Sequence, residues 1–324
     1  MSELRWNPTL EEWVVTATHR MDRPQMPKDW CPFCPGSGRV PENYDVYLYP
    51  NDYPTFSTPP PARSVEGKGL YNVEDAVGTC DVVLYSPDHN ASLASLEVGH
   101  IAKLVRLWQE RFRELSSREE VKYVFIFENN GEAIGVTMPH PHCQIYAFPF
   151  IPPKAEKELN ASLKHYRARG SCLFCNILRA ELSDGRRIVL TEGDFVAFVP
   201  FYARYPFEIH IYPRTHLGTI AEIAPGGIFS LAKIIKKLIM TYNNLYGFPF
   251  PYMMVMHQSP TDGGDYRHYH FHVEFYPPYR SRTKLKYLAG CESGAGTFIN
   301  DSSAEEKAAE LRKSYQLSAV SHQL

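Results

Sequence analysis

The sequence lacks a strong charge of either sign, and it lacks long apolar runs. Its formal net charge is -2, charged residues make up 22% of the chain, and no long run of lysine and arginine occurs. We therefore expect no nucleic-acid or membrane partner and favour a small molecule. Nowhere do about eighteen apolar residues follow one another, and the first residues lack the basic-then-apolar pattern of a signal peptide. A soluble, cytoplasmic protein is expected.

Cysteine is also scarce, with seven residues in a chain of 324. Four of the seven form two C-x-x-C pairs, Cys31 with Cys34 and Cys172 with Cys175. In a reducing compartment such pairs indicate metal ligands rather than disulfides. The remaining cysteines have no obvious partner in the sequence: Cys80, Cys143 and Cys291.

The same order of motifs occurs twice along the chain. In each half a C-x-x-C pair is followed by a histidine and then by an H-x-H segment. These histidines are His89 and His140 in the first half, and His216 and His270 in the second. A repeated order of this kind predicts two structural repeats.

Each half also contains one strong helical pattern. Apolar residues recur at helical spacing between residues 96 and 115, and again between residues 228 and 245. Short stretches rich in β-branched and aromatic residues favour antiparallel strands, and they start at residues 81, 121, 208 and 252. The expected fold class is α+β, with an antiparallel sheet flanked by helices. A Pro- and Gly-rich stretch from residue 57 predicts a mobile loop, and the last 20 or so residues predict a peripheral helix.

The strongest chemical signal is the segment HPHCQ at residues 140–144. In an extended segment, residues two apart point the same way, so His140, His142 and Gln144 project from one face. Three polar side chains on one strand face indicate a chemical role. A pair of solvent-facing histidines on an edge strand is the alternative, and the flanking residues decide against it.

The segment and its flanks resemble galactose-1-phosphate uridylyltransferases, a branch of the histidine-triad superfamily. The resemblance covers nearly the whole chain, through HRMDRP from residue 19, CPFCPGSGRV from 31, NDYPTF from 51, SPDH from 86, FENNG from 127, YPFEIHIYP from 205 and FYPPYRS from 275. It implies duplicated histidine-triad-like repeats, a catalytic one at residues 1–152 and a second at 153–324. It also implies galactose metabolism, with exchange of a uridylyl group between UDP-glucose or UDP-galactose and hexose 1-phosphate, in a homodimer.

The resemblance further implies the roles of single residues. His142 is the nucleophile on the α-phosphorus and carries the uridylyl group as a covalent intermediate, because a neutral imidazole is a competent nucleophile near pH 7. Gln144 donates an amide hydrogen bond to the phosphoryl oxygens without ionising. Contacts to the nucleotide and its phosphates are implied for Arg20, Arg23, Asn51, Asp52, Asn129 and Thr137. Contacts to the sugar phosphate are implied for Lys286 and Glu292.

Two positions depart from the family pattern. The family usually has serine where Thr137 stands, a change that keeps the hydroxyl. It has tyrosine where Cys291 stands, in the segment that contacts the sugar. The sequence therefore leaves the preference for galactose or another hexose open.

The first C-x-x-C pair and two later histidines form a set of four ligands typical of structural zinc: Cys31, Cys34, His89 and His140. Four protein ligands leave no open position for water, so the metal would hold the strand that bears the nucleophile. Two buried thiols without a metal are the alternative.

A second metal site has two candidate ligand sets. By the repeat, the equivalent set is Cys172, Cys175, His216 and His270. The resemblance implies another set of one glutamate and three histidines: His165, His257, His272 and Glu274. We favour zinc on the cysteine set, because thiolates outcompete imidazole and carboxylate for zinc. Glu274 stands where the repeat places the equivalent of Gln144 and would repel a phosphate, so we expect the second repeat not to be catalytic.

Two other functions agree with parts of the sequence. ADP-sugar phosphorylases of the same superfamily share both cysteine pairs, although NDY at residues 51–53 favours uridine. The third possibility is a non-catalytic, zinc-stabilised nucleotide-binding protein, against which the intact H-P-H-x-Q segment argues.

Overall fold

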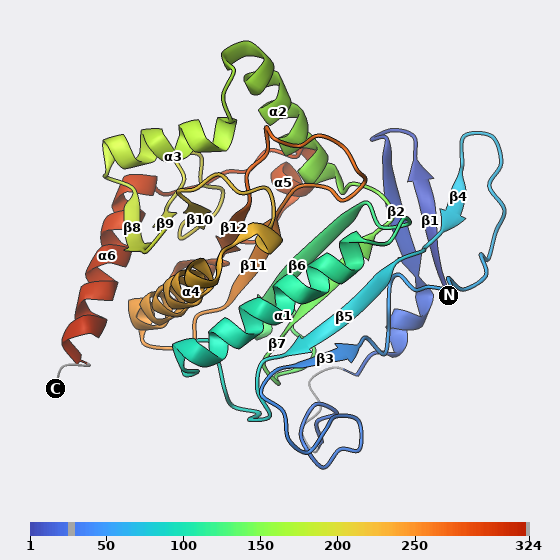
Figure 1. Ribbon diagram of the computed structural model, residues 1–324, viewed down its shortest axis with the longest axis horizontal. Helices are drawn as coiled ribbons and strands as arrows, with labels where there is room; N and C mark the ends of the chain where they lie inside the picture. Colours follow the sequence, from blue (N-terminus) through green and yellow to red (C-terminus); the bar gives the residue numbers. More distant parts are fainter. Residues whose placement is uncertain (25–29, 322–324) are drawn as a thin grey trace.

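The fold is known from a computed structural model, which describes residues 1–24 and 30–321. Its centre is a nine-stranded sheet in the order β3-β5-β7-β6-β11-β12-β10-β9-β8, in which every neighbouring pair is antiparallel (Figure 1). The strands are β3 (Tyr47–Pro50), β5 (Thr79–Leu84), β6 (Tyr123–Asn130), β7 (His142–Phe148), β8 (Ile188–Glu192), β9 (Phe195–Phe198), β10 (Ile209–Pro213), β11 (Tyr252–His257) and β12 (His272–Tyr276). All four stretches expected to form strands lie in this sheet, and the α+β prediction is confirmed.

The strand order is nearly symmetric about the centre of the sheet. There β6 pairs with β11, from Asn130 opposite Tyr252 to Ile126 opposite Met256. Outward from this pair, β7, β5 and β3 follow on one side, and β12, β10 and β9 follow on the other. His142 begins β7 and His272 begins β12, so the two H-x-H segments enter equivalent strands.

Two long helices cover one face of the sheet (Figure 1). They are α1 (Val98–Ser116) and α4 (Pro225–Tyr246), which pack against each other where the helical patterns predict helices. Their apolar faces share one core with the sheet, in which Trp108 and Leu231 are fully buried. Burial of these faces supplies the main driving force for folding. The peripheral helix α6 (Ala304–Ser321) packs on α4 and is also as predicted.

The opposite face of the sheet carries the smaller elements. A three-stranded sheet of β1 (Ser2–Asn7), β2 (Glu12–Ala17) and β4 (Val73–Asp75) packs Leu4 near Tyr146 and Phe148 of β7. Helices α2 (Pro153–Arg169) and α3 (Leu173–Asp184) cover the second half. The remaining short elements are η1 (Thr18–Asp22), η2 (Glu132–Ile134), η3 (Ile220–Glu222), β13 (Tyr279–Ser281), β14 (Lys284–Leu285) and α5 (Gly290–Ala295). Because β7 alternates, Cys143 faces the helical core while His142 and Gln144 face this second side.

The carboxyl group of Glu128 lies inside the core, on the strand that pairs with β7. Glu128 of β6 is 4% exposed and accepts hydrogen bonds from the hydroxyls of Tyr85 (2.8 Å) and Tyr252 (3.1 Å). Burial raises its pKa to about 7, because the charged form loses its hydration. The unfolded chain ionises this group near its ordinary value of 4.5, so its contribution to stability falls as the pH rises from about 4.5 through 7.

We predict that Glu128→Gln raises the melting temperature relative to wild type more at pH 8 than at pH 5. The amide keeps the shape of the carboxyl group but cannot ionise, so it avoids the cost of a buried charge. Thermal unfolding of both proteins at the two pH values measures the difference. A difference that is the same at both pH values would show that Glu128 does not titrate in this range.

Candidate functional site

His142 is held in one tautomer by the backbone. Its Nδ1 lies 2.7 Å from the carbonyl oxygen of His140. A carbonyl only accepts, so Nδ1 carries the proton and Nε2 keeps its lone pair. Burial lowers the pKa of His142, and the nearby charge of Arg23 lowers it further. The side chain is therefore a neutral imidazole at pH 7 with a free nucleophilic nitrogen.

Two adjoining cavities, of about 290 and 280 Å³, meet at His142. Both are also lined by Gln144, Arg23 and Thr137. Asn51 and Asp52 line only the first of the two, which we call the nucleoside cavity after the contact expected for these residues. Arg20 and Asn129 line only the second, which we call the phosphate cavity for the same reason. The structure thus brings together all the residues expected to contact the nucleotide.

The phosphate cavity carries two guanidinium groups. Arg23 Nη2 donates to Thr137 Oγ1 at 2.6 Å. Arg20 Nη1 donates to the carbonyl oxygen of Tyr53 (2.8 Å) and to Thr55 Oγ1 (3.0 Å). Burial and the charge of Arg20 lower the pKa of Arg23, so the two cations repel each other. Two close cations paired with neutral oxygens form a place suited to an anion such as a diphosphate.

The nucleoside cavity is organised around Asp52. Its carboxylate accepts from Tyr49 OH (2.9 Å) and from Arg39 Nη1 (2.9 Å). Asn51 Oδ1 accepts from the backbone N–H of Tyr53 at 2.9 Å, which shapes the turn after β3. An anchored carboxylate beside an amide can accept hydrogen bonds from the hydroxyl groups of a ribose.

One wall of this cavity is aromatic, and its residues were not predicted from the sequence. The Phe33 ring lies 5.3 Å from Tyr49 and 5.8 Å from His142, measured between ring centroids. Phe33 stands inside the first C-x-x-C pair, so the turn that carries the cysteines also places an apolar surface beside the nucleophile. The position of Phe33 between the two predicted metal ligands Cys31 and Cys34 was the signal in the sequence that could have identified it.

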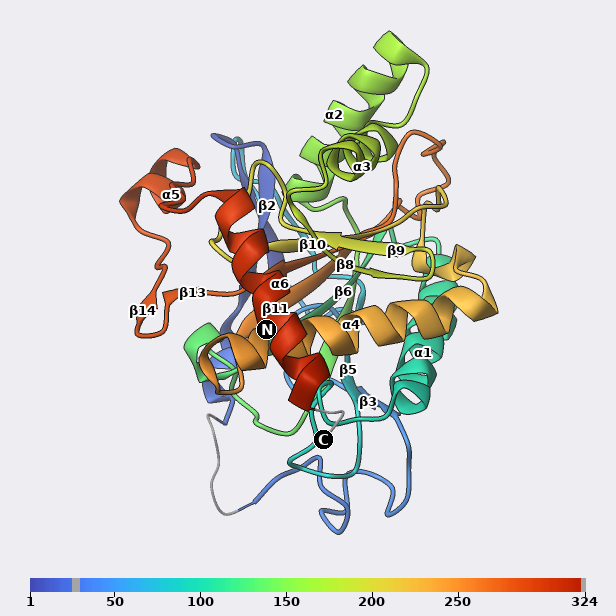
Figure 2. The same cartoon turned by 90° about the vertical axis from the view of Figure 1, so that its left-hand side faces the viewer.

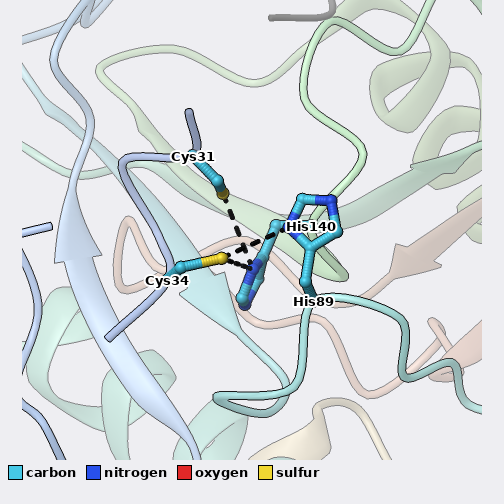
Figure 3. Close-up of side chains that lie close together, drawn as sticks. All are labelled: Cys31, Cys34, His89 and His140. Carbon is cyan, nitrogen blue, oxygen red and sulfur yellow. Dashed lines mark hydrogen bonds between the residues drawn. The ribbon is translucent and has the colours of Figure 1, made fainter. Parts of the chain in front are cut away.

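The first predicted metal set comes together (Figure 3). One donor atom from each of the four residues lies within 4.8 Å of every other, so Cys31, Cys34, His89 and His140 can hold a metal ion. Cys34 Sγ is 3.3 Å from His89 Nδ1 and 3.6 Å from His140 Nδ1. His140 Nε2 is 2.8 Å from the carbonyl oxygen of Ser86, which fixes the proton there and leaves Nδ1 free to ligate.

The second cysteine set repeats this arrangement. Cys172, Cys175, His216 and His270 also have donor atoms within 4.8 Å of one another. Cys175 Sγ lies 3.2 Å from Nδ1 of both histidines, and His270 Nε2 lies 3.1 Å from the carbonyl oxygen of Pro213. The carbonyl fixes the proton on Nε2 of His270 and leaves Nδ1 free to ligate. This set can therefore hold a metal ion as well.

Two members of the alternative second set, His257 and His272, lie in one group that can hold a metal ion, and the other two, His165 and Glu274, lie outside it. A third group that can hold a metal ion contains Glu158, His257 and His272. His165 is absent from it, since its Nε2 lies 2.8 Å from Nδ2 of Asn176. Glu158 comes from the same helix, α2, and takes the place predicted for His165. His272 Nε2 is buried without a hydrogen-bond partner in the described part of the chain, as an atom facing a metal would be.

Glu274 lies beside this group but is engaged by cations. Lys154 forms an ion pair with its carboxylate, and Arg204 Nη2 approaches it to 3.5 Å. His210 Nε2 is a further 3.2 Å neighbour. The second half therefore has a buried polar cluster where the first half has an open phosphate cavity.

Lys286 and Glu292 lie away from His142. They form an ion pair at 3.1 Å and line another cavity, of about 400 Å³. Glu292 belongs to α5, which lies at the end of the molecule opposite the loop of residues 30–46 (Figures 1 and 2). One chain does not bring these two residues to the nucleophile.

The chain matches two family models over almost its whole length. The N-terminal domain of galactose-1-phosphate uridyl transferase matches residues 1–152, and the C-terminal domain matches residues 158–324. Galactose-1-phosphate uridylyltransferase of Thermotoga maritima is 43% identical over 97% of this chain and 98% of its own length. The Rattus norvegicus protein of the same name is 33% identical over 95% of this chain and 86% of its own length.

Solved structures are also similar to this chain over nearly its whole length. A structure described as uridylyltransferase superposes with a TM-score of 0.89 at 36% identity, covering 98% of this chain and 99% of that one. An ADP-glucose phosphorylase from Arabidopsis thaliana has a TM-score of 0.75 at 24% identity, covering 97% and 98%. The latter likeness shows a shared fold. No helix among residues 1–24 and 30–321 combines the length and apolar character that a membrane crossing requires.

We predict that replacing Cys172 and Cys175 together by serine removes one zinc ion per chain, because serine hydroxyls are poor zinc ligands. Elemental analysis of the purified protein measures the zinc content. Cys291→Ser is the matched control, since Cys291 is exposed and belongs to none of the three groups. Equal zinc in the double variant and wild type would reject this cysteine set.

Proposed function

The chain belongs to the galactose-1-phosphate uridylyltransferase family, and we propose that His142 carries out its uridylyl exchange between UDP-glucose and galactose 1-phosphate. The observation that carries this assignment is the hydrogen bond between His142 Nδ1 and the carbonyl of His140. It leaves Nε2 unprotonated at the junction of the nucleoside and phosphate cavities. A nucleophile in this position faces both the nucleoside and the phosphorus of a bound nucleotide sugar.

The exchange proceeds by two displacements at one phosphorus. In the first, His142 Nε2 forms a bond to the α-phosphorus of UDP-glucose, and the bond to the oxygen of glucose 1-phosphate breaks. In the second, a phosphate oxygen of galactose 1-phosphate attacks the same phosphorus, and the N–P bond breaks to give UDP-galactose and free His142. Dividing one difficult displacement into two easier ones is the advantage of the covalent intermediate.

The other residues of the two cavities bind and orient the nucleotide. Arg20 and Arg23 hold the diphosphate and offset the negative charge that His142 must approach. Gln144 donates to a phosphoryl oxygen, with Asn129 and Thr137 as further polar contacts. Asn51 and Asp52 read the nucleoside, with Asp52 on the ribose hydroxyls. The Phe33 ring covers the neighbouring apolar surface.

We assign structural zinc to the two cysteine sets. The chemistry of two thiolates and two imidazoles suits zinc, and four protein ligands leave no position for a substrate. The residues that would hold the first ion are Cys31, Cys34, His89 and His140. Those for the second are Cys172, Cys175, His216 and His270. Bound there, zinc supplies cross-links between distant segments.

Three further proposals concern the whole molecule. The repeats divide at residues 152 and 153. Since Lys286 and Glu292 lie away from His142 in one chain, a homodimer in which they contact the sugar phosphate from the second copy completes the site. The free thiols of the metal sets require a reducing compartment, which the cytoplasm provides.

We predict that His142→Gly abolishes exchange between UDP-glucose and galactose 1-phosphate but leaves the zinc content and melting temperature near those of wild type. His142 is in none of the groups that can hold a metal, whereas His140 is. Formation of UDP-galactose measures activity, and a parallel assay with ADP-glucose tests the base preference. His140→Ala is the comparison, and it should lose zinc and stability. Equal loss of zinc in His142→Gly would contradict the separation of roles.

Replacing Gln144 by histidine should slow exchange and favour hydrolysis. Losing one preorganised donor costs about 100- to 1000-fold in rate. An imidazole can transfer a proton to or from water, which the amide cannot. The ratio of UMP released to UDP-hexose formed should therefore rise above the wild-type ratio. If both rates fall and the ratio stays constant, Gln144 only positions the phosphate.

A further inference from the structure

Tyr146 has a contact with Gln144 that the exchange reaction described above does not use. Both residues are on β7, two positions apart, so they face the same side of the sheet. Tyr146 OH donates to Gln144 Oε1 at 3.2 Å. Both side chains line the phosphate cavity. The hydroxyl of Tyr146 thus contacts the side-chain oxygen of Gln144.

The direction of this hydrogen bond follows from a third residue. Arg20 Nη1 lies 3.5 Å from the Tyr146 oxygen, and a guanidinium can only donate. The phenol therefore cannot donate to Arg20, whose Nη1 hydrogens serve the shorter bonds to Tyr53 and Thr55. Its proton is donated to Gln144. Burial raises the pKa of Tyr146, so the phenol keeps that proton at neutral pH.

Neighbouring rings hold the phenol in place. The Tyr146 ring is 5.0 Å from Phe127 in an edge-on arrangement and 6.3 Å from Phe56, measured between centroids. These contacts remain when the hydroxyl is removed. Tyr146→Phe is therefore expected to fold normally and to delete only the polar contact.

We propose that Tyr146 is a positioning residue that fixes the orientation of the Gln144 amide. With Oε1 occupied by the phenol, the NH₂ group points into the phosphate cavity, where it can donate to a phosphoryl oxygen. Without the phenol, a half-turn of the amide presents its oxygen to the phosphate, and two acceptors repel each other. This role rests on the proposed uridylyl exchange, and it assigns the orientation of Gln144 to the chain Arg20–Tyr146–Gln144.

The first test is the rate at which His142 of Tyr146→Phe becomes uridylylated in a single turnover with UDP-glucose. We expect a rate about 3- to 10-fold below wild type, as for one lost hydrogen bond that acts in the transition state. KM for UDP-glucose and the melting temperature should stay close to wild type. Tyr47→Phe, which removes a hydroxyl from β3 outside both cavities, is the matched control and should react at the wild-type rate.

A double-mutant cycle separates positioning from other roles. If Tyr146 acts only through the amide, Tyr146→Phe added to Gln144→Ala causes no further loss of rate. The same fold loss in both backgrounds would overturn the proposal, as would a wild-type rate in Tyr146→Phe. Failure of wild type itself to transfer uridylyl groups would overturn the proposed function instead.

Discussion

The arrangement of the reactive centre depends on the hydrogen bond between His142 Nδ1 and the carbonyl of His140. It fixes the tautomer of the nucleophile, and it does so through the backbone of a residue whose ring belongs to the first metal group. The turn with Cys31 and Cys34, the loop with His89 and the start of β7 converge on that group. A group of side chains that can hold a metal ion and a reactive imidazole thus share one short segment, so positioning the first also orients the second.

The second half of the chain shows what this arrangement needs beyond the backbone. His272 Nδ1 lies 2.9 Å from the carbonyl of His270, as in the first half. Its ring, however, is fully buried against Phe174 and Tyr212, and Glu274 occupies the position equivalent to Gln144. A carboxylate there would repel phosphate. The rings of Phe174 and Tyr212 pack against the His272 ring. Oriented histidines occur in both halves, but the His272 ring is fully buried, whereas His142 lines two cavities.

The sequence was sufficient for features that depend on local spacing. The alternation of His140, His142 and Gln144 and the helices α1 and α4 follow from short-range patterns. The two cysteine sets join residues far apart in the sequence, and the repeated order of motifs predicted them. Predicting His165 instead of Glu158 was an error of tertiary docking: the two residues are two helical turns apart on α2 and share a face, and the packing of α2 decides which one reaches His257. Tyr49 and Tyr146 escaped notice because aromatic residues in strands are usually core residues, and only the fold reveals their hydroxyl partners.

The proposed exchange depends on covalent attachment of the uridylyl group to His142. Mass spectrometry of the protein after incubation with UDP-glucose alone detects this attachment. We expect one added uridylyl group per chain, located on the peptide that contains His142, and its disappearance when galactose 1-phosphate is added. A protein that forms UDP-galactose without becoming labelled, or that is labelled on another residue, would contradict it.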